Sequence, residues 1–279
     1  MTPPDHPETV VLTGGTSGIG LATARALAAR GDHVVLAVRD PGKGHRAAQT
    51  LAAGVPGTVD VRRLDLADLA SVRAFADDLP GTVDVLVNNA GRSVPTLQRT
   101  PEGRELQFAT NHLGHFALTN LLLPRIRRRV VTVSSRAERA GRLDDVDFTR
   151  TRYRPFRAYA TSKLANLVFT HELQRRLAAT GSAVTATAAH PGYVATGMTG
   201  ADGGWAVRHL AQSPEQGAWP TLLALDPATP GGTFTGPRRW LHMRGEAVVI
   251  DSSRRSLDPG VAERLWRQSE EFTGVRFPG

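Results

Sequence analysis

Short Val-rich segments alternate with helical patterns along most of the chain, and this alternation limits the possible folds more than any other feature. The segments are almost continuously apolar in their centres, which is typical of strands covered on both faces. They occupy 9–13, 33–38, 59–66, 83–91, 129–135 and 183–192. Between them, apolar residues recur at spacings of three and four. This spacing predicts helices at 18–31, 45–53, 68–79, about 102–126 and 159–181. The alternation predicts a doubly wound α/β fold of the Rossmann type.

The last third of the chain is less regular. The segment 197–213 is rich in glycine, and we expect it to form a loop or a lid over a substrate. A short helix near 214–225, a last strand around Thr233–Phe234 and a helix near 258–272 follow. We find no internal repeat and no linker. We therefore expect a single domain over residues 1–279, built on a mainly parallel seven-stranded sheet.

Composition excludes several classes of protein. The chain has no cysteine, so it has neither disulfides nor thiolate chemistry. No apolar run approaches the ~20 residues that cross a bilayer, and the N-terminal segment with Asp5 and Glu8 does not resemble a signal peptide. We expect a cytoplasmic protein that binds no membrane. The net charge of +8 comes almost entirely from arginine. No expected helix shows a basic stripe interleaved with aromatic residues. The positive charge therefore indicates a composition biased toward arginine rather than a nucleic-acid partner.

A glycine-rich segment, TGGTSGIG at 13–20, lies between the first strand and the first helix. Its glycines suit a tight turn, close approach of the backbone to a pyrophosphate and close packing of helix on strand. The N-terminus of the helix then offers free N–H groups to the phosphates. The segment lacks the Gly-Lys-Ser/Thr of a P-loop, and the simpler alternative is a plain glycine turn. We expect a dinucleotide to contact Gly14, Thr16, Ser17, Gly18, Ile19 and Gly20.

Further motifs follow in a fixed order: NNAG, ATNHLGHF, VTVSS, YATSK and HPGYVAT. With TGGTSGIG, this order resembles the short-chain dehydrogenase/reductase family, and the resemblance covers essentially the whole chain. The C-terminal SEEFTGVRF is similar to the retinol-dehydrogenase-like and WW-domain-oxidoreductase-like branch. No single motif decides the matter; their order and their positions at strand ends do.

The resemblance implies a catalytic tetrad of Asn111, Ser135, Tyr159 and Lys163. Tyr159 would transfer the proton, Ser135 would hold the substrate oxygen, and Asn111 would hold a water connected to Lys163. The residues support part of this reading directly. Tyr159 and Lys163 are four apart on one helix face, and a nearby cation lowers the pKa of a phenol. Only two of the 34 basic residues are lysines, Lys43 and Lys163. A slim ammonium has room beside both a tyrosine and a cofactor ribose, where a guanidinium does not.

The cofactor implied by the resemblance is NADP(H). Arg39 ends the second strand, where a guanidinium suits a 2′-phosphate. Asp40 is the rival, because an acid at this position would accept from a free ribose hydroxyl and favour NAD. We expect Asp40 to cap the next helix instead. The remaining contacts expected for the cofactor are Asp65, Leu66, Asn89, Ala90, Gly91, Tyr159, Lys163, Pro191, Gly192, Val194 and Thr196.

These observations predict an NADP(H)-dependent oxidoreductase that interconverts an alcohol and a carbonyl, most simply by reducing a ketone of a small organic or natural-product-like substrate. The alternative is a non-catalytic nucleotide sensor on the same fold. We expect no metal site, because His112, His115 and His190 have no carboxylate at ligand spacing. The seven arginines of 136–157 either guide an acidic substrate or form a solvated surface paired with Asp144, Asp145 and Asp147. The sequence leaves a homo-oligomer open.

Overall fold

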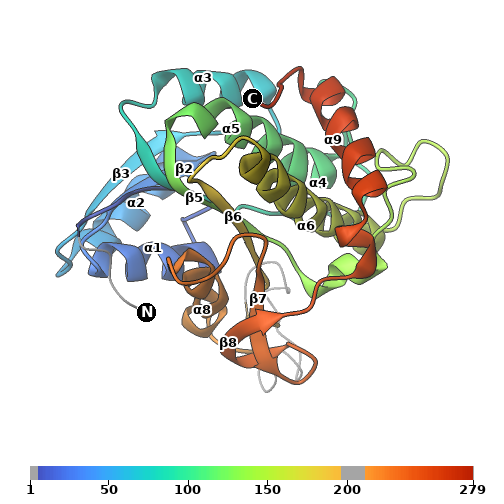
Figure 1. Cartoon of the computed structure of the whole chain (residues 1–279). Coiled ribbons are helices and arrows are strands. Elements are labelled where there is room, and N and C mark those ends of the chain that lie inside the picture. The colour runs from blue at the N-terminus through green and yellow to red at the C-terminus, as the bar shows by residue number, and fades with distance from the viewer. Residues whose placement is uncertain (1–5, 196–210, 279) are drawn as a thin grey trace.

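The computed structural model describes residues 6–195 and 211–278. Its core is an eight-stranded sheet in the order β3-β2-β1-β4-β5-β6-β7-β8 (Figure 1). The strands are β1 Thr9–Thr13, β2 His33–Val38, β3 Thr58–Arg63, β4 Val83–Asn88, β5 Ile126–Val133, β6 Thr185–Ala189, β7 Phe234–Arg239 and β8 Arg244–Ile250. The first seven run parallel, and β8 pairs with β7 in the antiparallel direction. The predicted Rossmann-type fold is confirmed.

The prediction of seven strands is wrong by one, because β8 was missed. This strand lies at the edge of the sheet, and most of its side chains are only partly buried, so it lacks a continuous apolar pattern. Its turn also carries no glycine or asparagine signal. Trp240, Leu241 and His242 adopt positive φ angles of 53°, 54° and 67°, which side chains other than glycine rarely do.

Helices cover both faces of the sheet (Figure 1). They are α1 Gly18–Ala29, α2 Pro41–Ala52, α3 Leu69–Asp78, α4 Leu106–Phe108, α5 Gly114–Leu122, α6 Pro155–Ala179, α8 Pro214–Leu225 and α9 Pro259–Thr273. Successive strand residues point to opposite faces. Val10 and Leu12 therefore pack in one core with α1, α2 and α8. Val11 packs in the other core, with α3, α5, α6 and α9.

Two helices differ from their predicted bounds in ways that matter for the site. The single helix expected over about 102–126 begins at Leu106 and is interrupted by a π-helical turn over Ala109–Leu113. Helix α6 begins at Pro155, four residues before Tyr159, so the YATSK motif lies inside the helix rather than at its start. In the described ranges, none of the helices combines the length and the apolar character needed to cross a membrane.

Candidate active site

The loop between β1 and α1 has the shape that phosphate binding requires. Gly14 and Gly18 adopt positive φ angles of 72° and 54°, a conformation that suits glycine. A Cβ atom on Gly20 would lie 2.3 Å from the Gly14 carbonyl oxygen and 2.5 Å from the side-chain nitrogen of Asn89. Ser17 caps α1 with its backbone alone, without a side-chain bond to the helix within the described residues. The first N–H groups of α1 therefore remain available for an anion.

Thr13 joins this loop to the NNAG motif. Its Oγ1 accepts hydrogen bonds from the backbone N–H groups of Asn89 and Ala90, both at 2.9 Å. The Asn89 side chain donates to the Thr13 carbonyl at 2.7 Å, and His115 Nε2 lies 2.9 Å from Thr13 Oγ1. Asn89, predicted to contact the cofactor, thus also holds the loop in place. Sequence reasoning missed the roles of Thr13 and His115, because nothing in the local pattern connects residues so far apart.

Asn111 lies in the π-helical turn and connects two parts of the site. Its Oδ1 accepts from the backbone N–H of Arg92 at 2.8 Å, and its Nδ2 donates to the Arg92 carbonyl at 3.0 Å. The same Nδ2 is 3.0 Å from Ser162 Oγ, next to Lys163 in α6. Its own carbonyl is bonded to His115 Nδ1 at 2.9 Å. Asn111 therefore fixes the loop after Gly91 against the helix that carries YATSK.

Lys163 is buried, with 3% of its surface exposed. Its ammonium donates to the Val133 carbonyl at 2.9 Å and lies 5.7 Å from the centre of the Tyr159 ring. A Cβ atom on Gly91 would lie 3.5 Å from Lys163 Nζ and 3.6 Å from Asn111 Oδ1, so these two predicted catalytic groups meet at Gly91. Burial lowers the pKa of Lys163 to about 8. The lysine therefore titrates near physiological pH.

Tyr159 and Ser135 form the other half of the predicted tetrad. Burial raises the pKa of Tyr159, and the Ser135 hydroxyl beside it acts in the opposite direction. Burial is the larger of these two effects, so the pKa of Tyr159 lies above its usual value. Ser135 lies beyond the end of β5, where it caps a short 3-10 helix and accepts from the Ala137 N–H at 3.2 Å. Ser134 points elsewhere and donates to the Lys163 carbonyl at 2.7 Å.

At the end of β2, Arg39 and Asp40 are both exposed. Asp40 caps α2, and its carboxylate accepts from the Lys43 N–H at 3.1 Å, as expected. This hydrogen bond lowers the pKa of Asp40. One oxygen of the Asp40 carboxylate is thus bonded to the helix. Further along, Asp65 accepts from the Ala67 N–H at 3.0 Å, and the Leu66 side chain is buried in the core.

The HPG segment after β6 is held by distant residues. Gln212 donates to the Pro191 carbonyl at 2.7 Å, and the Gly192 N–H donates to His190 Nδ1 at 3.3 Å. Gly192 has a positive φ of 83°, and Val194 is buried. Thr196 and most of the predicted lid over 197–213 lie outside the described residues. The lid remains a prediction, although Gln212 and Ser213 at its end are bonded into the segment before it and into α8, respectively.

The histidines of the long helix have structural partners. His112 Nε2 is 2.9 Å from Ser269 Oγ in α9, and His115 bridges Thr13 and Asn111. In the part of the chain that the structure describes, no group of three or more His, Asp or Glu residues is arranged to hold a metal ion.

The arginine-rich insert pairs with different acids from those expected. Arg136 is 3.2 Å from Asp251, and Arg139 is also bonded to Asp251, which lies outside the insert just after β8. Asp145 instead accepts from the backbone and side chains of Thr149 and Thr151. The expected pairing of the insert with its own acids is therefore only partly right: it holds for the Arg157–Asp144 pair at 4.0 Å.

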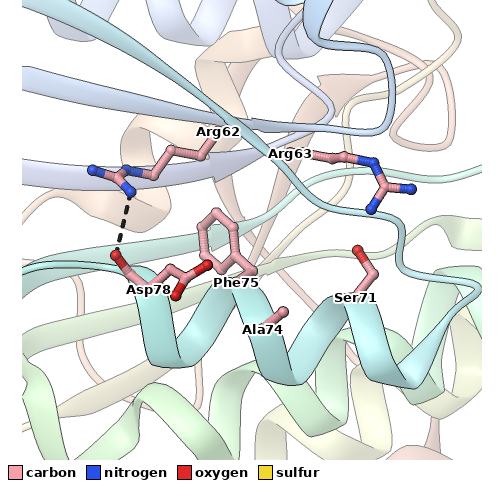
Figure 2. Close-up of a pocket in the computed structure, with 6 residues that line it drawn as sticks. All are labelled: Arg62, Arg63, Ser71, Ala74, Phe75 and Asp78. Carbon is pink, nitrogen blue, oxygen red and sulfur yellow. Dashed lines mark hydrogen bonds between the residues drawn. The ribbon is translucent and has the colours of Figure 1, made fainter.

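A hollow of about 390 Å³ lies between β3 and α3, and the Arg62 guanidinium donates to the Asp78 carbonyl at 3.3 Å. Figure 2 shows the residues that line the hollow and this hydrogen bond. The other residues that line it are Arg63, Ser71, Ala74 and Phe75. None of the predicted site residues lines this hollow, so it is separate from the candidate active site.

Comparison with known proteins agrees with the fold. Residues 8–206 match the short chain dehydrogenase family model. The chain belongs to the short-chain dehydrogenase/reductase family of oxidoreductases. Within it, the chain lies in the retinol-dehydrogenase-like branch: Retinol dehydrogenase 13 of Homo sapiens is 38% identical over 296 aligned positions, covering 97% of this chain and 86% of that protein.

Solved structures show the same relationship. The crystal structure of an uncharacterized protein from Mycobacterium paratuberculosis is 49% identical, with a TM-score of 0.88 and coverage of 100% of this chain and 99% of that one. A protein from Beutenbergia cavernae, provisionally named an NAD(P)-dependent gluconate 5-dehydrogenase, has NADP bound at low occupancy. It is 28% identical, with a TM-score of 0.69 and coverage of 84% and 96%.

Proposed function

We propose that this oxidoreductase uses NADP(H) to interconvert an alcohol and a carbonyl, and that it acts chiefly as a ketone reductase on a small organic substrate. The observation that carries the proposal is the meeting of Lys163 and Asn111 at Gly91, with the Lys163 ammonium 5.7 Å from the centre of the Tyr159 ring and a glycine loop with free helix N–H groups in the same fold. A sensor that only binds a nucleotide does not need a buried cation next to a phenol. Burying that cation costs free energy, as the lowered pKa of Lys163 indicates.

The residues fit a dinucleotide. At Gly20 the helix packs so closely on the loop that a Cβ would clash with the Gly14 carbonyl oxygen, and this close packing together with the free N-terminus of α1 suits a loop that holds a pyrophosphate. When bound, the nicotinamide supplies or accepts the hydride. Tyr159 donates a proton to the carbonyl oxygen in reduction and removes it from the alcohol in oxidation. Ser135 hydrogen-bonds the same oxygen and orients it. Lys163 supplies positive charge beside the phenolate that Tyr159 becomes after donating its proton.

The preference for NADP(H) is supported by the state of Asp40. Asp40 Oδ1 accepts from the Lys43 N–H at the start of α2, and this bond to the helix favours Arg39 as the side chain that meets a ribose substituent. NADP is bound in the relative from Beutenbergia cavernae. A charge-assisted bond from a guanidinium contributes about 1.5–3 kcal/mol, which corresponds to about ten- to a hundredfold in affinity. A cytoplasmic location and a small-molecule substrate, with neither membrane nor nucleic acid as a partner, remain predictions.

The function is tested by following the absorbance of NADPH and NADH with a panel of ketones and aldehydes, using wild type and Arg39→Ala. We expect turnover of at least one carbonyl substrate, a higher kcat/KM with NADPH, and loss of most of that preference in the variant. Tight binding of NADPH without turnover of any member of the panel would favour the sensor. Equal kcat/KM for the two cofactors in wild type would refute the cofactor assignment.

A further inference from the structure

Arg92 follows the NNAG motif, and the predicted tetrad holds its backbone. Asn111 Oδ1 accepts from the Arg92 N–H at 2.8 Å, and Asn111 Nδ2 donates to the Arg92 carbonyl at 3.0 Å. The residue before it, Gly91, packs against Lys163 and Asn111. The Arg92 side chain thus starts from a point fixed at the end of β4, beside the candidate active site. No sequence motif assigns it a role.

Three charged side chains act on the guanidinium of Arg92: Arg39, Asp65 and Glu105. Burial, and then the charge of Arg39, lower the pKa of Arg92, whereas the charges of Asp65 and Glu105 raise it. Arg39 follows β2, Asp65 follows β3, and Arg92 follows β4. These three strands run parallel within the order β3-β2-β1-β4, so their carboxyl ends lie along one edge of the sheet. Ligands bind at this edge in doubly wound folds.

The cluster is electrostatically incomplete. The Nε of Arg92 is buried and has no hydrogen-bond partner among the described residues. A buried donor without a partner costs free energy, as do two guanidinium groups placed close together. Both acids that act on Arg92 already have backbone partners: Asp65 Oδ1 accepts from the Ala67 N–H, and the two oxygens of Glu105 accept from the first N–H groups of α4. An anion between the two arginines relieves the repulsion and gives the Nε an acceptor, whereas a neutral adenine ring relieves neither.

From this arrangement we infer that Arg92 is a second ligand, beside Arg39, for the phosphate on the adenosine 2′-position, and that it helps to set the preference for NADP over NAD. The inference rests on the proposed function, because it needs the dinucleotide to lie along this edge with its adenosine at the ends of β2 and β3. Two guanidinium groups hold the three oxygens of a phosphate in a defined geometry, which a single exposed arginine cannot do.

The test uses adenosine 2′,5′-bisphosphate and adenosine 5′-monophosphate as probes, with dissociation constants measured by isothermal titration calorimetry. The two ligands differ only in the 2′-phosphate, so the ratio of their affinities isolates its contribution. The variants are Arg92→Gln, Arg92→Lys, Arg39→Gln and the control Arg63→Gln. Arg63 is exposed at the end of β3 and loses the same charge, but it lines the separate hollow beside α3.

We expect Arg92→Gln to weaken the bisphosphate about ten- to a hundredfold and to leave the monophosphate nearly unchanged, which also shows that the variant is folded. Arg92→Lys should weaken the bisphosphate less than Arg92→Gln does, and Arg63→Gln should change neither affinity much. An equal loss for both probes would assign Arg92 to the adenine and overturn the inference. The inference would also be overturned if Arg39→Gln reduced the affinity for the bisphosphate and Arg92→Gln left it unchanged. In that case the proposed function would stand. Equal affinity of wild type for both probes would instead refute the NADP preference itself.

Discussion

The ammonium of Lys163 lies 5.7 Å from the centre of the Tyr159 ring while it donates to the Val133 carbonyl at the end of β5. The distance between cation and phenol is therefore set by a strand as well as by the helix that carries both side chains. The Ser134 hydroxyl, bonded to the Lys163 carbonyl, anchors the same turn of α6 to the end of β5. The relation between the two residues is therefore rigid, as proton transfer requires.

Tyr159→Phe should remove most of the turnover and leave the fold and cofactor binding intact. Only the hydroxyl transfers the proton, and general acid catalysis contributes roughly 10²–10⁴-fold. The measurement is kcat with a carbonyl substrate, together with cofactor affinity from fluorescence titration. The matched control is Tyr153→Phe, which removes a hydroxyl bonded to Gln107 and to the Val94 carbonyl. This control variant should lower the free energy of unfolding and leave kcat nearly unchanged. Near-wild-type kcat in Tyr159→Phe would contradict the assignment.

Lys163→Arg should fail to support activity although it keeps the charge. The side chain is buried against Val133 and Gly91, so the bulkier, planar guanidinium lacks room there. We expect kcat/KM to fall by at least about a hundredfold. Lys43→Arg is the control, since it alters the only other lysine, which is exposed on α2. If Lys163→Arg kept most of the wild-type kcat/KM, the argument from geometry would be wrong.

Gly20→Ala should abolish dinucleotide binding, and Gly91→Ala should be tolerated much better. At position 20 the new Cβ would lie 2.3 Å from a backbone oxygen, so the phosphate loop must shift. At position 91 the nearest atoms are 3.5 Å and 3.6 Å away, which is ordinary van der Waals contact. Cofactor affinity from fluorescence titration and the melting temperature check both variants. Equal losses of affinity would show that the predicted tightness at Gly20 is irrelevant to binding.

The protein should lose stability in mild acid. Burial lowers the pKa of His112 and His190 to about 3 and of His115 and His171 to about 4. Below pH ~6.5 the unfolded chain therefore binds protons that the folded chain does not. As the pH is lowered, the free energy of unfolding therefore decreases by up to about 1.4 kcal/mol per pH unit for each of these histidines, until the pH reaches the folded-state pKa.

Urea unfolding between pH 5 and 8 measures this effect. His112→Gln should make the dependence on pH shallower, because glutamine does not titrate but can still bond to Ser269. Comparing the two proteins cancels the contribution of the carboxyl groups that both share. If the free energy of unfolding depended on pH with the same slope in wild type and variant, His112 would not contribute to the pH dependence as predicted.

Several parts of the site could be predicted because their signals are local. The strand centres are runs of apolar residues, the phosphate loop is a run of glycines between a strand and a helix, and Asp40 lies directly before Pro41, where a helix cap is expected. Tyr159 and Lys163 are neighbours because four residues make about one helical turn. Each of these inferences needs only the chain within a few residues of the position in question.

By itself, therefore, the sequence determined the Rossmann-type fold, the phosphate loop and the pairing of Tyr159 with Lys163. The tertiary structure alone decided which distant groups meet: Thr13 with His115, 102 residues apart, and Asn111 with Arg92, 19 apart. It also decided the π-helical turn at Asn111, the edge strand β8 and the approach of Arg92 to Arg39. Local patterns cannot predict such contacts, because a hydrogen bond or a charge pair depends on where separate elements pack and not on the residues beside it in the chain.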